Sequence, residues 1–109
     1  MSKLYKDIGK RGSGKSTRLL KQALSNHANI AVGYATYVEY FVAIAFNLQI
    51  PIKHTSYGAI IGDVKVAPIT YYLNPNNTKD GKPVYIDELD LCLNRLLPIA
   101  GYTISEEDE

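Results

Sequence analysis

A glycine-rich segment near the N-terminus carries the residues best suited to chemistry. Its spacing is G-x-x-x-x-G-K-[ST], matched without exception by Gly9, Lys10, Arg11, Gly12, Ser13, Gly14, Lys15 and Ser16. The glycines permit backbone conformations that a Cβ forbids, so successive N–H groups can turn inward and surround an anion. The segment is therefore predicted to form a phosphate-binding loop for ATP or another nucleoside triphosphate.

The residues at the end of the loop predict where the phosphates lie. Apolar residues at 19, 20, 23 and 24 form a helical stripe, and the N-terminus of that helix would point at the bound anion. The motif places the Lys15 ammonium on the β- and γ-phosphates and makes the Ser16 hydroxyl a ligand of Mg²⁺. Thr17, at the start of the helix, completes the predicted nucleotide contacts.

Two adjacent carboxylates end a second segment of interest. Residues 83–86 are predicted to form a buried strand, and Asp87 and Glu88 follow at its carboxyl end. An Asp-Glu pair is common and by itself is weak evidence of a site. Its value as evidence comes from the β-forming residues before it and the phosphate loop upstream. Asp90 is predicted to lie at the start of a helix over 91–97 in preference to binding metal.

Together the two segments resemble the Walker A and Walker B motifs of the P-loop NTPase superfamily. The resemblance is to the division in which a catalytic glutamate follows the Mg²⁺ aspartate, as in RecA-type ATPases, AAA+ proteins, helicases and viral packaging motors. It implies that Asp87 holds Mg²⁺ through its water shell. It also implies that Glu88 orients or deprotonates the attacking water, with Lys15 as the second catalytic residue.

A narrower resemblance covers most of the chain. Residues 9–20, 30–32, 84–90 and 101–105 look like small, poorly characterised ATPases of bacteriophages and prophages, although only the two nucleotide motifs are highly specific. In the superfamily a Ser or Thr after the strand that follows the acidic motif senses the γ-phosphate. Thr103 or Ser105 matches that place, and a β-forming threonine on a terminal strand is an equal alternative.

Alternating strands and helices must position these residues. Strands are predicted over 4–8, which is short and interrupted by charge, and over 29–34. A helix is predicted over 37–49, ended by Pro51, and its segment 40–46 is apolar all round, which favours burial over an oligomer contact.

Further along the chain, 53–62 is ambiguous, 64–66 and 69–73 are predicted to be extended, and 74–82 is a polar loop. This order predicts a three-layer α/β fold with a mostly parallel sheet.

Composition limits the class of protein. The chain has 109 residues, of which 46% are apolar and 21% charged, so one minimal domain over 1–109 is expected, with an acidic tail at about 106–109. No apolar run approaches the roughly 20 residues of a membrane-spanning helix, and the N-terminus does not read as a secretory signal. Cys92, the single cysteine, excludes an internal disulfide. A cytoplasmic location is expected, in the host if the chain is phage-encoded.

Charge and aromatic content leave partners open. Residues 1–21 hold seven cations and one carboxylate, whereas 87–109 hold seven carboxylates and one cation. No basic patch beyond the loop supports nucleic acid as a partner. Of the three arginines, Arg11, Arg18 and Arg95, the last is best placed to reach a neighbouring subunit of a homo-oligomer. Five tyrosines could stack on bases, although packing is the commoner role: Tyr34, Tyr37, Tyr57, Tyr71 and Tyr72.

Two functions from different classes follow. The first is a Mg²⁺-dependent ATP-binding protein with slow ATPase activity, acting as an oligomer or as an accessory to phage DNA replication or packaging. The alternative is a non-hydrolysing module for nucleotide or polyphosphate, acting as a phage accessory or host-interaction factor. Glu88 favours the first, and the short chain and irregular first strand favour the second. A third hypothesis, a small-molecule kinase, is less favoured because the sequence has no lid region with clustered arginines.

Overall fold

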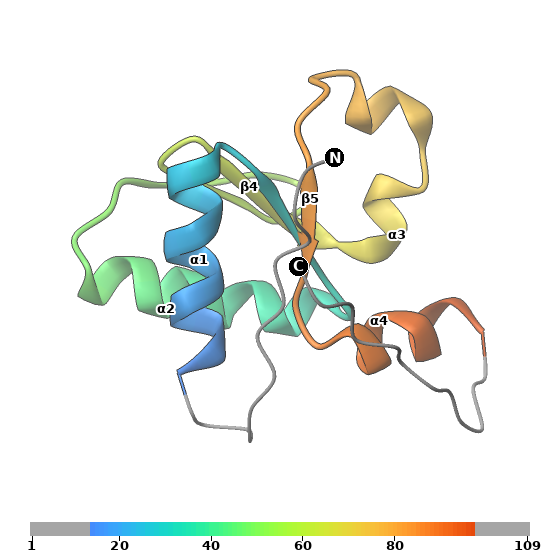
Figure 1. Cartoon of the computed structure of the whole chain (residues 1–109), viewed down its shortest axis with the longest axis horizontal. Coiled ribbons are helices and arrows are strands. Elements are labelled where there is room, and N and C mark those ends of the chain that lie inside the picture. Colours follow the sequence, from blue (N-terminus) through green and yellow to red (C-terminus); the bar gives the residue numbers. More distant parts are fainter. Residues whose placement is uncertain (1–13, 98–109) are drawn as a thin grey trace, which may run out of the picture.

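A mixed five-stranded sheet organises the part of the chain that the computed structural model describes, residues 14–97 (Figure 1). The strands lie in the order β2-β3-β4-β1-β5. β1 (Asn29–Val32) is parallel to both β4 (Val64–Pro68) and β5 (Val84–Ile86). β2 (Ile52–His54) and β3 (Ala59–Ile61) form an antiparallel hairpin that joins β4 at the opposite edge.

The prediction of a mostly parallel sheet is therefore not confirmed for the described strands. Two of their four pairings are parallel and two are antiparallel. The difference arises from 53–62, which the sequence left ambiguous. There, Thr55 and Gly58 close a tight turn, with the Thr55 N–H donating to the Gly58 carbonyl (3.0 Å) and the Gly58 N–H to the Thr55 hydroxyl (3.1 Å).

Helices cover both faces of the sheet (Figure 1). α1 (Lys15–Asn26) and α2 (Val38–Asn47) pack on one face, where Leu20, Ile30 and Phe41 are fully buried. α3 (Ile69–Tyr72) and α4 (Leu89–Leu96) lie over a smaller core on the other face, which includes Ala31 and Cys92. Because neighbouring residues of β1 point to opposite faces, this one strand belongs to both cores.

Two predictions about these elements are wrong. Residues 69–72 form the short helix α3, not a strand, because Pro68 ends β4 and the Tyr72 hydroxyl reaches back to the carbonyl oxygens of Ile30 (2.9 Å) and Lys65 (3.0 Å). Burial raises the pKa of Tyr72, which keeps the hydroxyl protonated and able to donate. The helix over 37–49 forms as α2, but it is buried on one face only, since Tyr40 is 63% and Phe46 is 75% exposed.

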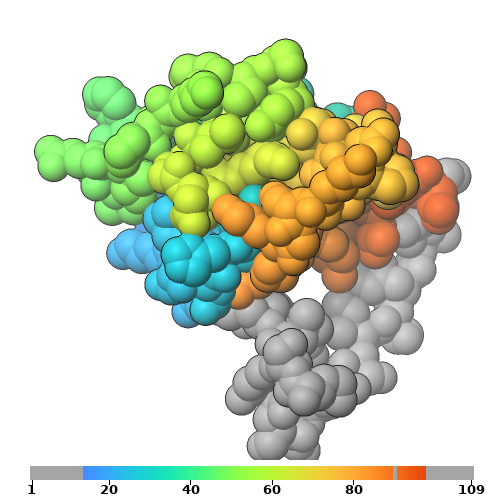
Figure 2. Space-filling view, turned by 90° about the horizontal axis from the view of Figure 1, so that it is seen from above, coloured from blue at the N-terminus to red at the C-terminus, as the bar shows by residue number. Residues whose placement is uncertain are grey.

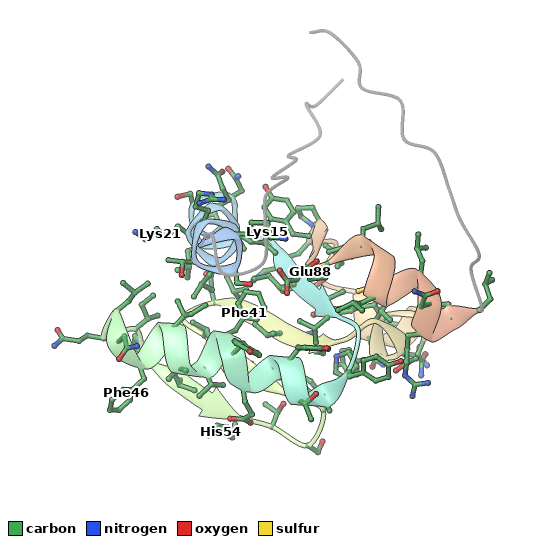
Figure 3. The ribbon with its side chains drawn as sticks, turned by 90° about the horizontal axis from the view of Figure 1, so that it is seen from below. Lys15, Lys21, Phe41, Phe46, His54 and Glu88 are labelled. Atoms are coloured by element: carbon green, nitrogen blue, oxygen red, sulfur yellow. The ribbon has the colours of Figure 1, made fainter. Side chains whose placement is uncertain are left out.

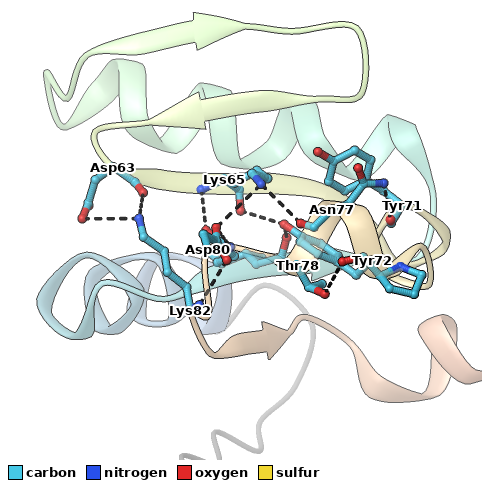
Figure 4. A network of polar contacts seen from close by, with 11 residues as sticks. Asp63, Lys65, Tyr71, Tyr72, Asn77, Thr78, Asp80 and Lys82 are labelled. Carbon is cyan, nitrogen blue, oxygen red and sulfur yellow. Dashed lines mark hydrogen bonds and ion pairs between the residues drawn. The ribbon is translucent and has the colours of Figure 1, made fainter.

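A polar network holds the loop before β5 against the sheet (Figure 4). Asn29, only 2% exposed, donates to the Asp80 carboxylate (3.0 Å) and accepts from the Lys65 N–H (3.2 Å), while its own N–H donates to the Pro83 carbonyl (2.8 Å). The bond from Asn29 also lowers the pKa of Asp80. Within this loop, Pro75–Thr78 form a 3-10 turn. The network places the start of β5 beside β1 and so positions the carboxylates at the other end of β5.

Three segments meet on one face of the molecule, as the space-filling view shows (Figure 2). They are the end of α1, the turn between β3 and β4, and the loop before β5. His27, just past α1, lies 2.7 Å from the Asp63 carboxylate, and the Lys82 ammonium donates to the Asp63 carbonyl (2.8 Å). Asn26 donates to the Tyr85 hydroxyl (2.8 Å), which ties α1 to β5 directly.

The hairpin turn supplies a test of the mixed sheet. A Cβ on Gly58 would overlap the carbonyl oxygen of Val66 on β4, and that backbone is held on both sides by other strands. Gly58→Ala is therefore expected to lower the free energy of unfolding by about 3 kcal/mol. Gly81→Ala is the matched control, because it meets only the strain of a positive φ (+69°) in open space and should cost about 1 kcal/mol. Urea denaturation measures both, and equal costs would contradict the strand pairing.

Candidate functional site

Helix α1 begins at Lys15, within the last two residues of the predicted phosphate loop. Gly14 has a φ of +87°, which glycine adopts without strain, and its carbonyl accepts the first helical bond from the Arg18 N–H (3.0 Å). The N–H groups of the first turn have no partner within a helix, and the helix dipole adds partial positive charge there. Lys15, Ser16 and Thr17 therefore open α1 at an end suited to an anion.

The Lys15 ammonium forms an ion pair with the Glu88 carboxylate at 3.0 Å (Figure 3). Both side chains are largely shielded, with 18% of Lys15 and 26% of Glu88 exposed. The residues are 73 positions apart, so the contact depends on tertiary structure. An ammonium that is only partly hydrated needs an anionic partner, and Glu88 supplies one.

Ser16 and Asp87 form the second contact between the two motifs. The Ser16 hydroxyl donates to Asp87 Oδ1 at 3.3 Å, far inside the roughly 10 Å within which a hydrated Mg²⁺ could be shared. The Asp87 N–H donates to the Ala31 carbonyl (2.9 Å), continuing the pairing of β5 with β1. The two motifs, predicted separately, thus meet at the carboxyl ends of two parallel strands.

Glu88 has a strained backbone. Its φ of +54° and ψ of +74° are unusual for a residue with a Cβ, and a left-handed conformation costs roughly 1–2 kcal/mol. Glu88 lies at the N-cap of α4, where its carbonyl accepts from the N–H groups of Leu91 (3.0 Å) and Cys92 (3.1 Å). The turn directs its carboxylate toward Lys15 in place of continuing β5. Asp90 lies in the first turn of α4, as predicted.

A cavity of about 270 Å³ joins these polar groups to an aromatic wall. Gly14 to Thr17, Asp87 and Glu88 form its polar part. Tyr37, Tyr40 and Ile44 form the wall, at the start and along one face of α2. From the sequence, Tyr37 is only one of five tyrosines that could stack on bases, and neither Tyr40 nor Ile44 is predicted as a site residue. Their spacing of three and four residues was the available signal, because it places all three on one helix face.

The oxygens of Ser16 and Asp87 fit a magnesium site. Two oxygens that both contact one Mg²⁺ at about 2.1 Å must lie within roughly 4.2 Å of each other, and these two are 3.3 Å apart. The same separation also fits the arrangement expected from the resemblance, in which Ser16 would contact the ion and Asp87 would hold it through a bound water. Within 14–97 no group of three or more His, Cys, Asp or Glu side chains gathers as a metal site. Magnesium in nucleotide sites needs only one or two protein ligands, since phosphates and water supply the others.

Several predicted residues do not enter this geometry. Gly9 to Ser13 of the loop, the strand over 4–8, Thr103, Ser105 and the acidic tail lie outside the described residues. Arg18 is exposed and is not among the residues that line the cavity, although one of its guanidinium nitrogens would lie 3.4 Å from a Cβ placed on Gly14. The guanidinium of Arg95 lies over the Tyr34 ring at 5.4 Å. No arginine within 14–97 lines the cavity.

Comparisons with known proteins do not assign the chain to a family. No protein-family model matches the chain, and neither a curated protein nor a solved structure shows significant similarity to it. Across residues 14–97, no helix combines the length and the apolar character needed to cross a membrane. The proposed function therefore rests on the geometry of the site and on the two sequence motifs.

The backbone of Glu88 gives a test of the site's construction. Glu88→Gly and Glu88→Ala both remove the carboxylate, but only alanine keeps the strain of a positive φ. We expect the glycine variant to be the more stable of the two, by about 1 kcal/mol, after the larger backbone entropy of unfolded glycine is counted. At Ser25, exposed in α1, the order should reverse by roughly 0.5–1 kcal/mol. Thermal denaturation of the four variants measures this, and the same order at both positions would contradict the left-handed turn.

Proposed function

We propose that this domain binds a nucleoside triphosphate, in the first place ATP, as its Mg²⁺ complex and hydrolyses it slowly. The observation that carries the proposal is the pair of contacts Lys15–Glu88 and Ser16–Asp87. Each joins a residue of the phosphate motif to a residue of the acidic motif, in the roles that the P-loop resemblance implies. The parallel strands β1, β4 and β5 with helices on both faces are compatible with a P-loop-type fold, to which the β2–β3 hairpin is an addition.

In the proposed mechanism, binding begins with an exchange of partners at Lys15. Lys15 holds Glu88 until a phosphate, carrying more negative charge, replaces the carboxylate as its partner. This exchange leaves the ammonium compensated throughout, so Lys15 is never a shielded cation without an anionic partner. The first-turn N–H groups of α1 add further donors to the same phosphates.

The exchange also frees Glu88 for catalysis. The released carboxylate can accept a proton from a water as the water oxygen bonds to the γ-phosphorus and the bond to the β–γ bridging oxygen breaks. Mg²⁺, held by Ser16 and Asp87, would supply charge neutralisation on the phosphates. Glu88 is thus the base in the bound state and the partner of Lys15 in the free state.

A second candidate function is a binding module without hydrolysis. The cavity has no arginine among its described lining residues, and an arginine that stabilises transition-state charge is worth roughly 10³–10⁵ in rate in related enzymes. Without such a group, supplied by another part of the chain or by a neighbouring subunit, turnover would be very slow. Action as an oligomer, or in phage DNA replication or packaging, rests on the sequence resemblance.

Lys15→Ala tests binding. The variant loses the charged contact to the β- and γ-phosphates, worth about 1.5–3 kcal/mol, so the Kd for Mg²⁺-ATP should rise at least tenfold. Lys21→Ala is the matched control, because Lys21 lies on the same helix and points away from Glu88 (Figure 3). Isothermal titration calorimetry measures affinity, and circular dichroism checks the fold. Unchanged affinity in a folded Lys15→Ala protein would reject the phosphate site.

Glu88→Gln separates the two functions. Loss of the ion pair to Lys15 should tighten Mg²⁺-ATP binding by up to roughly fivefold, while loss of the base should lower phosphate release by about 10². Glu39→Gln, at an exposed glutamate of α2, is the control.

Asp87→Asn should instead weaken binding only when Mg²⁺ is present. Single-turnover release of phosphate measures hydrolysis by each protein. If Glu88→Gln binds Mg²⁺-ATP more tightly and the wild type shows no turnover, the binding module is selected. Weaker binding of Mg²⁺-ATP by Glu88→Gln would contradict the exchange of partners at Lys15.

A further inference from the structure

The aromatic wall of the cavity has no part in the chemistry proposed above. Tyr37 and Tyr40 lie with ring centroids 6.2 Å apart and planes inclined by 26°, close to a stacked arrangement. Tyr37 also packs against the main core, which holds the inner ring in place. Tyr40 continues the stack outward and is 63% exposed.

Other tyrosines of the described chain have structural partners. Tyr57 and Tyr71 stack on each other at 4.3 Å, and the Lys65 ammonium lies over both rings. Tyr72 is buried with its hydroxyl bonded, and Tyr34 lies beneath Arg95. Tyr40 differs because much of its ring is open to solvent at the mouth of a cavity that contains Lys15.

We propose that Tyr37 and Tyr40 form a stacking subsite for a planar nucleobase, so that the cavity recognises a nucleotide and not polyphosphate alone. The inference rests on the proposed function and names what the same site selects. Phosphate groups are alike in all nucleotides, so the polar part of the cavity cannot distinguish them from inorganic polyphosphate. An aromatic face can, because every nucleobase has a π-surface that stacks on it.

Two sources of this base are consistent with the subsite. One is the base of the triphosphate whose phosphates contact Lys15 and Ser16. The other is the base of a second nucleotide that lies beside the same phosphates. Both present the same planar ring to Tyr40, and only the dependence of each ligand on this residue separates them.

The experiment compares Tyr40→Ala with wild type by calorimetry, using Mg²⁺-ATP and Mg²⁺-tripolyphosphate as probes. Loss of stacking should weaken ATP binding about tenfold and leave tripolyphosphate unchanged, since stacking is worth between about fivefold and a hundredfold per base. Tyr40→Phe keeps the ring and should retain wild-type affinity. Phe46→Ala is the control, because Phe46 is an exposed aromatic residue on the same helix and outside the cavity (Figure 3).

A second arm identifies the other source. Protein saturated with the Mg²⁺ complex of the imido analogue of ATP is titrated with each of the four nucleoside monophosphates. If Tyr40→Ala leaves ATP affinity unchanged but weakens this second binding about tenfold, the base belongs to a second nucleotide. If Tyr40→Ala changes neither the affinity for Mg²⁺-ATP nor that for the monophosphates, the subsite is rejected, while binding of tripolyphosphate still supports the phosphate site. If tripolyphosphate and ATP both fail to bind wild type, the proposed function and this inference are overturned together.

Discussion

The parallel pairing of β1 with β5 is the constraint on which the site depends. α1 leads directly into β1, and β5 ends beside β1 with the Asp87 N–H bonded to the Ala31 carbonyl. The carboxyl ends of parallel strands share one edge of a sheet, so Asp87 and Glu88 emerge next to the first turn of α1. The buried contacts of Asn29 with Asp80 and Pro83 hold the opposite end of β5. A shift in that register would separate the two motifs.

The Lys15–Glu88 ion pair links this architecture to the proposed chemistry. A shielded ammonium without a partner would destabilise the fold, and a carboxylate paired with it cannot act on water at the same time. In the proposed mechanism a triphosphate would meet both conditions in one exchange, because it would become the partner of Lys15 and release Glu88. The strained turn at Glu88 is stable because its carbonyl caps α4. The residue that starts α4 is therefore also the one to which the proposed mechanism assigns the base.

Helix α2 gives the cavity an aromatic and apolar wall in addition to its polar part. Its inner residues, among them Phe41 and Ala45, fill the core, so the helix is anchored independently of any ligand. Tyr40 and Ile44 lie one turn apart and line the same cavity as Lys15 and Ser16. An anchored helix can present an exposed aromatic ring at little entropic cost, and this is the physical basis for the proposed recognition of a base.

Local signals in the sequence were enough to predict the helix after Gly14 and the strands near 30, 65 and 85, because apolar periodicity and runs of β-forming residues act over a few positions. The predicted burial of the strand over 83–86 is wrong, since β5 is only partly buried at the edge of the described sheet and Ile86 is 41% exposed. The closeness of Ser16 to Asp87 was expected from the two motifs, but these residues are 71 positions apart and only the fold brings them to 3.3 Å. The hairpin over 52–61, the helix at 69–72 and the one-sided burial of α2 were decided only by the tertiary structure. So was the partner of each tyrosine. Whether an apolar or β-forming residue is buried depends on which distant surface it meets, and that information is not contained in any local stretch of the chain.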